Sequence, residues 1–415
     1  MRNGSDTAPE LANHSDSTSE AIRVAWLFPM MLRTHYWQPV FREFTQLIPH
    51  STVFVGQWGG FAEGYQGTFE LRVLEGVRPI VLKNHQNGEQ YHSAFQWVPL
   101  SIIKELARVK PHVIFTTGFS AWTVCAMLYK MARHARVIVL WDGCSVHIES
   151  QTSLARRLQR RVMAPFIDFV VSNMREGIEY MQSALGMPPS KLLAHPYQVA
   201  DPSILDSSPC PRDFASARRP RFLFVGSIDP RKGWRALLEA TRHLVKRGMD
   251  QFSVLFVGAG IEEPELRAQI ANGLDHVAHY IGPIPYHCMA SVYRDTDVFV
   301  FPTMDDVWGL VLVEAMTFGK PIICSKFAGA REMVAHGKNG FIADPQASDS
   351  FADYMARFID NPSLMPNFGA ASLALIAPFT PRHAAQVLAD VALRSQSGNA
   401  NILCAGSRPT VDAYS

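Results

Sequence analysis

The sequence has little of what marks a membrane-spanning, disulfide-rich or metal-stapled protein. Its apolar residues nowhere form the roughly 18–20-residue run that a membrane-spanning helix requires. Its six cysteines lie far apart and form no Cys-x-x-Cys pair, which argues against structural zinc and against a disulfide framework. We therefore expect buried thiols in a reducing cytoplasm, with no resident metal ion and no cofactor.

The sequence also has no clear excess of positive or negative charge. The 39 Lys and Arg residues nearly balance the 37 Asp and Glu residues, which leaves a formal net charge of +2. A dedicated nucleic-acid binder usually carries a clear basic excess, so nucleic acid is not an expected partner. No Gly-x-Gly-x-x-Gly sequence follows a strand with an acidic residue about 20 positions on, which argues against a nicotinamide-dependent dehydrogenase.

The chain does have the length and composition of a two-domain globular protein. Its 415 residues suggest two domains of roughly 150–200 residues each, and 47% of the residues are hydrophobic. Residues 1–20 are polar, lack the apolar core of a signal peptide, and predict a disordered arm. We expect a cytoplasmic protein.

Short apolar runs alternate with helical patterns through the first half. The runs predict strands at 22–28, 52–55, 112–116, 137–140 and 166–171, and helices are expected at 99–109 and 121–133. Such alternation is typical of a parallel sheet covered by helices on both faces. Residues 21–200 are therefore predicted to form an N-terminal Rossmann-like domain, on the acceptor side of any reaction.

Proline, serine and aspartate interrupt this rhythm at 201–219, which predicts an interdomain linker. A second series follows, with strands expected at 221–225, 252–257, 279–281, 298–301 and 321–324. Helices are expected at 233–247, 262–272, 289–294, 310–318, 348–360 and 381–394. The prediction is an α/β fold of two doubly wound parallel-sheet domains, with a C-terminal domain at 220–375, a helix at 376–395 and a polar tail at 396–415.

The most informative stretch runs from a strand end at Phe301 into a helix near Gly309. A helix N-terminus offers free N–H groups and a positive dipole end to a phosphate, and glycine lets a ligand approach the backbone. Asp306 precedes this point, and Glu314 lies eight residues after Asp306 on the helix. A carboxylate beside a bound phosphate is suited to holding a diol. The alternative is that Asp306 caps the helix and Glu314 is solvated.

Two earlier strand ends carry glycine loops of the same kind. Gly226 follows the strand at 221–225, and Arg231 and Lys232 stand at the start of the next helix, where two cations can grip a diphosphate. Gly258 follows the strand at 252–257. Each of these loops alone could be an ordinary exposed loop. Because three such loops follow strands in the C-terminal half of the chain, together they predict ligand binding at the carboxyl ends of the strands.

The C-terminal half resembles the retaining glycosyltransferases of the group that includes glycogen synthase, sucrose synthase and bacterial mannosyltransferases. The matching pieces cover about 130 residues in the right order: Val225-Gly226-Ser227-Ile228, Lys232-Gly233, Phe301-Pro302-Thr303, Asp306-Val307-Trp308-Gly309-Leu310-Val311, Glu314-Ala315-Met316, Gly319-Lys320-Pro321-Ile322, Gly329-Ala330-Arg331-Glu332 and Asn339-Gly340-Phe341. The resemblance implies the GT-B fold, two Rossmann-like domains that face each other across a cleft.

The resemblance also implies roles for individual residues. Lys232 would hold the donor diphosphate, together with the backbone at Gly309 and Leu310. Glu314 would hold the ribose hydroxyls, and Asp306 would contact the transferred sugar. Gly226, Gly258, Trp308 and Val311 complete the expected donor site. The chain departs from the pattern in two places: Ser227 stands where the group usually has a diphosphate-binding arginine, which Arg231 would replace, and Asp306 stands in place of glutamate.

The N-terminal half resembles this group less. The histidine that often follows a later strand in the group is replaced by Trp141. His147 lies six residues further on, where it either substitutes for that histidine or is an ordinary surface residue. Tyr36, Trp37 and Asp142 follow strand ends and are the other acceptor-side candidates.

Residues 154–162 form an unusual basic segment. At helical spacing, Leu154, Leu158 and Val162 share one stripe, and Arg156, Arg157, Arg160 and Arg161 lie off it. One interpretation is a basic face that touches anionic lipid or a diphosphate-lipid acceptor. We expect instead an ordinary helix that packs its apolar side inward.

The predicted function is transfer of a hexose from a nucleotide diphosphate sugar to a hydroxyl of a sugar or lipid-linked acceptor, with retained anomeric configuration, in polysaccharide or glycoconjugate synthesis. In the resembling group, the leaving diphosphate takes the acceptor proton, so no separate base is required. The alternatives are a sugar-nucleotide epimerase and a non-catalytic nucleotide-sugar-binding protein. Ser227, Asp306 and Trp141 keep the last alternative open. The sequence does not indicate an oligomeric state.

Overall fold

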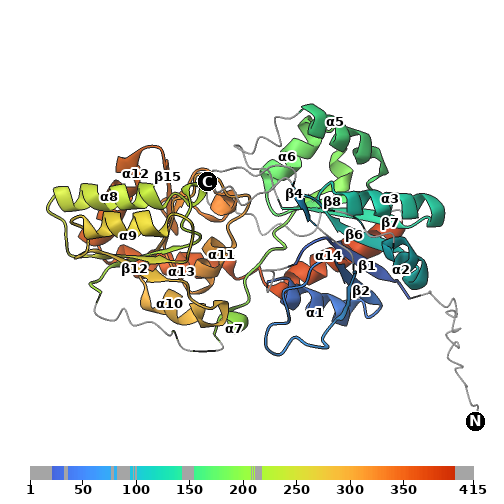
Figure 1. The fold of residues 1–415 in the computed structure, drawn as a ribbon, viewed down its shortest axis with the longest axis horizontal. Coiled ribbons are helices and arrows are strands. Elements are labelled where there is room, and N and C mark those ends of the chain that lie inside the picture. Colours follow the sequence, from blue (N-terminus) through green and yellow to red (C-terminus); the bar gives the residue numbers. More distant parts are fainter. Residues whose placement is uncertain are drawn as a thin grey trace, which may run out of the picture.

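A computed structural model of the chain describes residues 21–31, 36–75, 79–81, 94–96, 98, 101–142, 154–206, 208, 210 and 217–397. Figure 1 shows two α/β domains side by side, with the N-terminal strands in one and the strands from β10 onward in the other. The expected pair of parallel-sheet domains is confirmed. No helix within these described ranges is long and apolar enough to cross a membrane.

The N-terminal domain is built on a seven-stranded parallel sheet in the order β3-β2-β1-β6-β7-β8-β9. Its strands are β1 (Val24–Phe28), β2 (Ser51–Val55), β3 (Glu70–Val73), β6 (Val113–Thr117), β7 (Arg136–Trp141), β8 (Phe169–Ser172) and β9 (Leu192–Ala194). Every residue of β1 is buried, as in a central strand covered on both faces. Trp26 of β1 lies opposite Phe115 of β6, and their stacked ring centroids are 4.1 Å apart.

The helices of this domain are α1 (Trp37–Leu47), α2 (Ser101–Val109), α3 (Ala121–Arg133), α5 (Leu154–Met163) and α6 (Arg175–Ser183), with short 3-10 turns η1 (Ala164–Phe166) and η2 (Pro189–Lys191). A separate antiparallel pair joins β4 (Pro79–Val81) to β5 (Ala94–Gln96). The expected helix at 121–133 is confirmed to the residue, and Ser120 caps it by accepting a hydrogen bond from the Thr123 N–H.

The C-terminal domain is built on a six-stranded parallel sheet in the order β12-β11-β10-β13-β14-β15. Its strands are β10 (Arg221–Val225), β11 (Ser253–Val257), β12 (Ala278–Gly282), β13 (Val298–Phe301), β14 (Ile322–Ser325) and β15 (Gly340–Ala343). Its helices are α8 (Trp234–Lys246), α9 (Glu263–Ala271), α10 (Met289–Asp295), α11 (Leu310–Thr317), α12 (Ser348–Asp360) and α13 (Leu364–Ile376), with turns η3 (Pro230–Lys232), η4 (Tyr286–Cys288) and η5 (Gly329–Met333).

Each sheet has one point at which the strand order reverses. In the C-terminal sheet β10 pairs with β11 on one side and with β13 on the other. The loops after β10 and β13 therefore lead away in opposite directions, and ligands of doubly wound sheets bind in the space between such loops. The loop residues singled out in the sequence follow these two strands.

The last described helix returns to the first domain. Helix α14 (Pro381–Ser397) packs against α1 and also contacts β6 and β7. Figure 1 shows it in the N-terminal domain, and the Gln396 Nε2 donates a hydrogen bond to the His112 carbonyl at 2.9 Å. A helix was expected at 376–395, but residue 376 ends α13, and α14 extends to residue 397. The rest of the expected tail lies outside the described residues.

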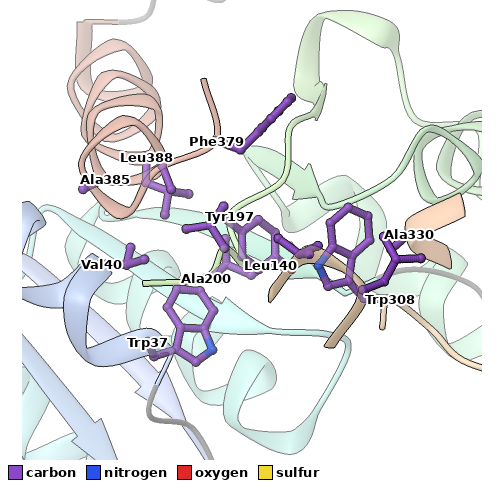
Figure 2. Packing of buried hydrophobic residues seen from close by; sticks show 14 of the residues in the cluster. Trp37, Val40, Leu140, Tyr197, Ala200, Trp308, Ala330, Phe379, Ala385 and Leu388 are labelled. Atoms are coloured by element: carbon purple, nitrogen blue, oxygen red, sulfur yellow. The ribbon is translucent and has the colours of Figure 1, made fainter. Parts of the chain in front are cut away.

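One apolar cluster crosses from domain to domain. Trp308 and Ala330 of the C-terminal domain belong to the same cluster as Leu140 and Tyr197 of the N-terminal domain (Figure 2). The Trp37 ring stacks on Tyr197, with centroids 5.4 Å apart. Because both domains contribute to this cluster, separating them would expose apolar surface to water.

The described part of the expected linker contacts both domains. It contains a short helix, α7 (Pro202–Leu205), whose N-cap Asp201 accepts a hydrogen bond from the Ser203 N–H at 3.0 Å. Asp201 also accepts a hydrogen bond from the Tyr65 hydroxyl of the N-terminal domain at 3.0 Å. Asp206 pairs with Arg294 of α10 at 2.5 Å. The domain boundaries themselves remain a prediction.

The expectation that the apolar stripe of residues 154–162 packs inward is wrong. Helix α5 forms, but Leu154, Leu158 and Val162 are 80%, 63% and 61% exposed. The inner side carries the buried Met163 and Arg160, whose Nη1 donates to the Tyr180 hydroxyl at 2.9 Å. Because these two side chains occupy the contact with the domain, the Leu-Leu-Val stripe is turned to solvent.

Candidate functional site

The loops after β10 and β13 bring opposite charges together at the reversal point of the sheet. The Lys232 ammonium pairs with Oδ2 of Asp306. The Arg231 Nη1 lies 3.8 Å from the same oxygen and donates a hydrogen bond to the Asp305 carbonyl at 3.0 Å. The side chains of Lys232, Arg231 and Asp306 are 15%, 19% and 10% exposed. These two largely buried cations have more N–H donors than the contacts with Asp305 and Asp306 use, and such donors suit a diphosphate.

Local backbone contacts hold the two loops together. The Asp229 side chain caps η3 by accepting a hydrogen bond from the Lys232 N–H at 3.1 Å. Gly233 follows at φ +70°, and a Cβ there would lie 1.9 Å from the Pro302 carbonyl oxygen. The Thr303 hydroxyl donates to the Arg231 carbonyl at 3.0 Å. The cations are therefore fixed directly against the loop that carries Asp306.

Gly309 sets the start of α11. Its φ is +100°, and a Cβ at this position would lie 2.6 Å from Cε1 of the Phe301 ring. No side chain of the described residues caps α11, so its first N–H groups, at Leu310 and Val311, can bind an anion. This is the arrangement expected from the sequence for binding phosphate at the backbone.

Glu314 is buried beneath the start of α11, at 2% exposure. Its Oε1 accepts a hydrogen bond from the Tyr286 hydroxyl at 3.0 Å, and its Oε2 accepts one from the Tyr293 hydroxyl at 2.8 Å. Burial raises the pKa of Glu314, and the two tyrosine hydrogen bonds oppose that rise. Each oxygen retains an acceptor site, so the carboxylate can still hold two hydroxyls of a diol.

The tyrosines at Glu314 link the donor side to Tyr36. Burial first, then the Glu314 charge and hydrogen bond, raise the pKa of Tyr286 well above 10, and Tyr36 adds a smaller increase. Tyr36 also adds to the raised pKa of Tyr197. The Tyr36 hydroxyl therefore interacts electrostatically with both phenols.

Trp308 connects the donor loop to the N-terminal domain. It is 3% exposed, and its Nε1 donates a hydrogen bond to the Gln198 carbonyl at 3.0 Å. The Gln198 Nε2 in turn donates to Oδ1 of Asp142 at 2.7 Å. Trp308 therefore contributes an interdomain contact to the expected donor site.

Asp142 is the best-placed acceptor-side candidate. Its Oδ1 also accepts a hydrogen bond from the Tyr197 hydroxyl at 2.8 Å. Asp142 is exposed, but the protein atoms around its carboxyl desolvate it, and this raises its pKa to about 6. A carboxylate that is reachable from solvent but poorly hydrated is suited to accept a hydrogen bond from a substrate hydroxyl.

The remaining candidates occupy different surroundings. A Cβ on Gly226 would lie 3.7 Å from the Lys232 stem, and one on Gly258 would lie 1.9 Å from the Gly226 carbonyl oxygen. The Ser227 hydroxyl has no hydrogen-bond partner within the described part of the chain. Trp37 is 3% exposed and belongs to the apolar core. His147 lies outside the described residues.

Sequence reasoning missed the residues that surround Glu314 and Asp142. Tyr293 lies four residues after Met289 in an expected helix, and this spacing places the two side chains on one buried face. Tyr286, Tyr197 and Gln198 carry no comparable local signal. Among the described residues, no group of three or more His, Cys, Asp or Glu side chains could hold a metal ion.

Comparison with known sequences agrees with the position of the site. Residues 212–373 match the family model described as "Glycosyl transferases group 1". The D-inositol 3-phosphate glycosyltransferase of Kribbella flavida is 27% identical over 53% of this chain and 54% of its own length. D-inositol 3-phosphate glycosyltransferase 2 of Catenulispora acidiphila is 30% identical over 42% of this chain and 43% of its own. The chain spans about half the length of the curated relatives it matches.

Solved structures share the fold over a larger part of the chain. Anabaena Alr3699/HepE in complex with UDP aligns with a TM-score of 0.69 and 17% identity, over 89% of this chain and 99% of that one. Sucrose-phosphate synthase from Thermosynechococcus elongatus aligns with a TM-score of 0.66 and 15% identity, over 91% and 100%. The chain has the two-domain GT-B fold of these structures, and its residues 212–373 are similar to the group 1 glycosyltransferases.

Proposed function

We propose that the protein transfers a hexose from a nucleoside diphosphate sugar to a hydroxyl of a sugar or lipid-linked acceptor, with retention of the anomeric configuration. One observation carries this proposal: Arg231, Lys232 and Asp306 meet at the reversal point of the C-terminal sheet, where α11 begins. The named activity of the relatives and the UDP and UDP-glucose bound in HepE support it.

The donor would be held at three points. Lys232, Arg231 and the first N–H groups of α11 bind the diphosphate, and Glu314 accepts the ribose hydroxyls. The Lys232 ammonium has three donors, so it can keep its contact with Asp306 while it binds a phosphate oxygen. Among the described residues, the side-chain contacts of Asp306 engage only Oδ2, which leaves Oδ1 for a hydroxyl of the transferred sugar.

The chemistry would then need little beyond positioning and charge stabilisation. As the bond between the anomeric carbon and the diphosphate breaks, Lys232 and Arg231 stabilise the negative charge that develops on the leaving group. The acceptor oxygen bonds to the same carbon from the same face, and its proton passes to a diphosphate oxygen. This course retains the anomeric configuration and uses no separate protein base.

The acceptor would lie against the N-terminal domain, with Tyr36 and Asp142 as its contacts. Asp142 is joined to the donor loop through Gln198 and Trp308, so an acceptor bound at Asp142 is held in a fixed relation to the donor. A sugar or lipid-linked acceptor implies that the enzyme acts in polysaccharide or glycoconjugate synthesis.

A second candidate is a nucleotide-sugar-binding protein without transferase activity. The unpartnered Ser227 hydroxyl and the pairing of Lys232 with Asp306 favour it, because one diphosphate-binding arginine is missing and one lysine is already engaged. An epimerase would use the same donor but would form no new glycoside.

The two candidates and the epimerase differ in their products. A thermal-shift screen against UDP, GDP and ADP selects the nucleotide, because a ligand that binds the native state raises the melting temperature. Nuclear magnetic resonance then follows the matching ¹³C-labelled sugar nucleotides with hexose, polyprenyl-phosphate and inositol 3-phosphate acceptors. A new glycoside with the donor's anomeric configuration supports the proposal. Binding without turnover, an inverted product or an epimerised donor would each overturn it.

A further inference from the structure

Helix α5 exposes a continuous apolar stripe. Leu154, Leu158 and Val162 are spaced four residues apart, lie on one side of the helix, and are 80%, 63% and 61% exposed. Arg157 and Arg161 have the same spacing one position earlier, so they flank the stripe, and both are exposed. Burial of this stripe in the domain core, the usual reason for amphipathic spacing, does not apply here.

A second exposed stripe lies on the neighbouring helix. Val124, Leu128 and Met131 of α3 share one side and are 38%, 53% and 66% exposed. Two contacts hold the helices together: the Lys130 ammonium donates to the Phe166 carbonyl just after α5, at 2.9 Å, and the Gln159 side chain of α5 donates to the Phe119 carbonyl just before α3, at 3.3 Å. We call these six apolar side chains of α3 and α5, with their flanking arginines, the α3–α5 face.

The charge of this face has one sign. Neither helix contains Asp or Glu, whereas α3 carries Lys130 and Arg133, and α5 carries four arginines. Lys130 is paired with Asp168, and Arg160 is turned inward against Trp141 and Tyr180. Arg156, Arg157 and Arg161 form no ion pair within the described part of the chain.

We propose that the α3–α5 face docks on a membrane surface rich in anionic lipid. Apolar side chains flanked by arginines on a helix that lies along the surface suit the boundary between acyl chains and headgroups. The stripe enters the acyl region, while Arg157 and Arg161 extend their guanidinium groups to the lipid phosphates.

The same observations disfavour a protein partner. Protein interfaces that match a basic surface offer paired acidic side chains, and a second copy of this chain would bring arginine against arginine at this face. An anionic bilayer satisfies the apolar stripe and the arginines at once. This proposal does not depend on the transferase activity, because it concerns a surface that carries none of the donor-site residues.

Flotation with lipid vesicles tests the proposal directly. The full-length protein is mixed with vesicles of phosphatidylcholine containing about one third phosphatidylglycerol, and with vesicles of phosphatidylcholine alone. The variants are Leu158→Ser and Arg157→Gln/Arg161→Gln. Ile261→Ser is the matched control, since Ile261 is 66% exposed on the other domain and Leu158 is 63% exposed. Thermal shift with UDP, GDP and ADP reports separately whether each variant is folded and whether it keeps the nucleotide response of the wild type.

We expect the wild type and Ile261→Ser to float with the anionic vesicles and to stay behind with the neutral ones. Arg157→Gln/Arg161→Gln should bind the anionic vesicles at least roughly 5-fold more weakly, because each arginine near such a surface contributes about 1 kcal/mol. Leu158→Ser should also lose affinity, with an unchanged nucleotide response. Flotation that is absent in the wild type, or unchanged in both variants, would overturn the proposal, as would wild-type dimers that Leu158→Ser converts to monomers.

Discussion

The indole Nε1 of Trp308 and the backbone carbonyl of Gln198 form a 3.0 Å hydrogen bond between the two domains. Trp308 stands two residues after Asp306, and the Gln198 side chain binds Asp142. A buried contact therefore runs from the donor loop to the acceptor-side carboxylate through a single residue. The same interaction holds the donor loop against the N-terminal domain.

Trp308→Phe should lower the free energy of unfolding more than Trp122→Phe does. Trp308→Phe leaves the Gln198 carbonyl without its partner, which costs about 1–3 kcal/mol in addition to the loss of packing. Trp122→Phe is the matched control, because Trp122 is fully buried and its Nε1 has no hydrogen-bond partner among the described residues. Urea unfolding measures both. Equal losses for the two variants would show that the interdomain hydrogen bond contributes nothing.

Gly309 should not tolerate a side chain. Gly309→Ala combines a positive φ with a Cβ placed 2.6 Å from the buried Phe301 ring, so the start of α11 must shift. Gly337→Ala shares the positive φ but has open space around its Cβ. Backbone strain alone costs about 1–3 kcal/mol, and only Gly309→Ala should also weaken binding of the screened nucleoside diphosphate in calorimetric titrations. Unaltered affinity for that nucleotide in Gly309→Ala would place the diphosphate elsewhere.

Glu314 should discriminate between ribose and deoxyribose. Its two oxygens each keep a free acceptor site beside the tyrosine hydroxyls, and Glu314→Gln replaces one of those oxygens with a donor. The wild type should prefer the nucleoside diphosphate that the thermal-shift screen selects to its 2′-deoxy analogue by about 1.5–3 kcal/mol, the usual contribution of a hydrogen bond to a charged group. Glu314→Gln should bind both nucleotides with nearly equal affinity. A preference that survives the substitution would assign the ribose contact to another residue.

Asp142 should make the stability of the folded protein vary with pH in the mildly acidic range. Its pKa is raised from 3.8 to about 6, so between these values the folded state binds a proton that the unfolded state has released. The contribution of Asp142 to stability therefore falls as pH rises through this window. Asp142→Asn lacks this dependence. The melting temperature of the variant relative to the wild type should rise between pH 4 and pH 6.5, and a constant difference would contradict the shifted pKa.

Local sequence was sufficient to predict the bounds of some single elements, but not strands such as β3, β9 and β15. The strands at 221–225 and 298–301 and the helix at 348–360 match the prediction to the residue, because each is bounded by abrupt changes of apolar pattern. Helix α13 was not predicted: it is apolar on nearly all sides, and so it lacks the periodic polar face that marks an amphipathic helix.

The contacts that complete the site could not be predicted in the same way. Glu314 meets Tyr286 across 28 residues, and Trp308 meets Gln198 across 110, so no spacing in the sequence reports them. The outward stripe of α5 is of the same kind. Amphipathic spacing reveals that one side of the helix is apolar. Which side faces the domain depends on a tertiary contact, the packing of the Arg160 guanidinium over the rings of Trp141 and Tyr180.

The initial rate of nucleoside diphosphate release tests the central claim most directly. This rate is measured for the wild type and for two variants. Lys232→Met removes the charge of the side chain and nearly keeps its length. Lys326→Met is the control, because it breaks an exposed ion pair with Asp344. With a donor of the matching base and an acceptor, the wild type and Lys326→Met should turn over equally. Lys232→Met should lose about 2–4 kcal/mol of transition-state stabilisation, at least roughly 30-fold in rate. Equal rates for Lys232→Met and the wild type, or no release by the wild type from any sugar nucleotide, would contradict the account.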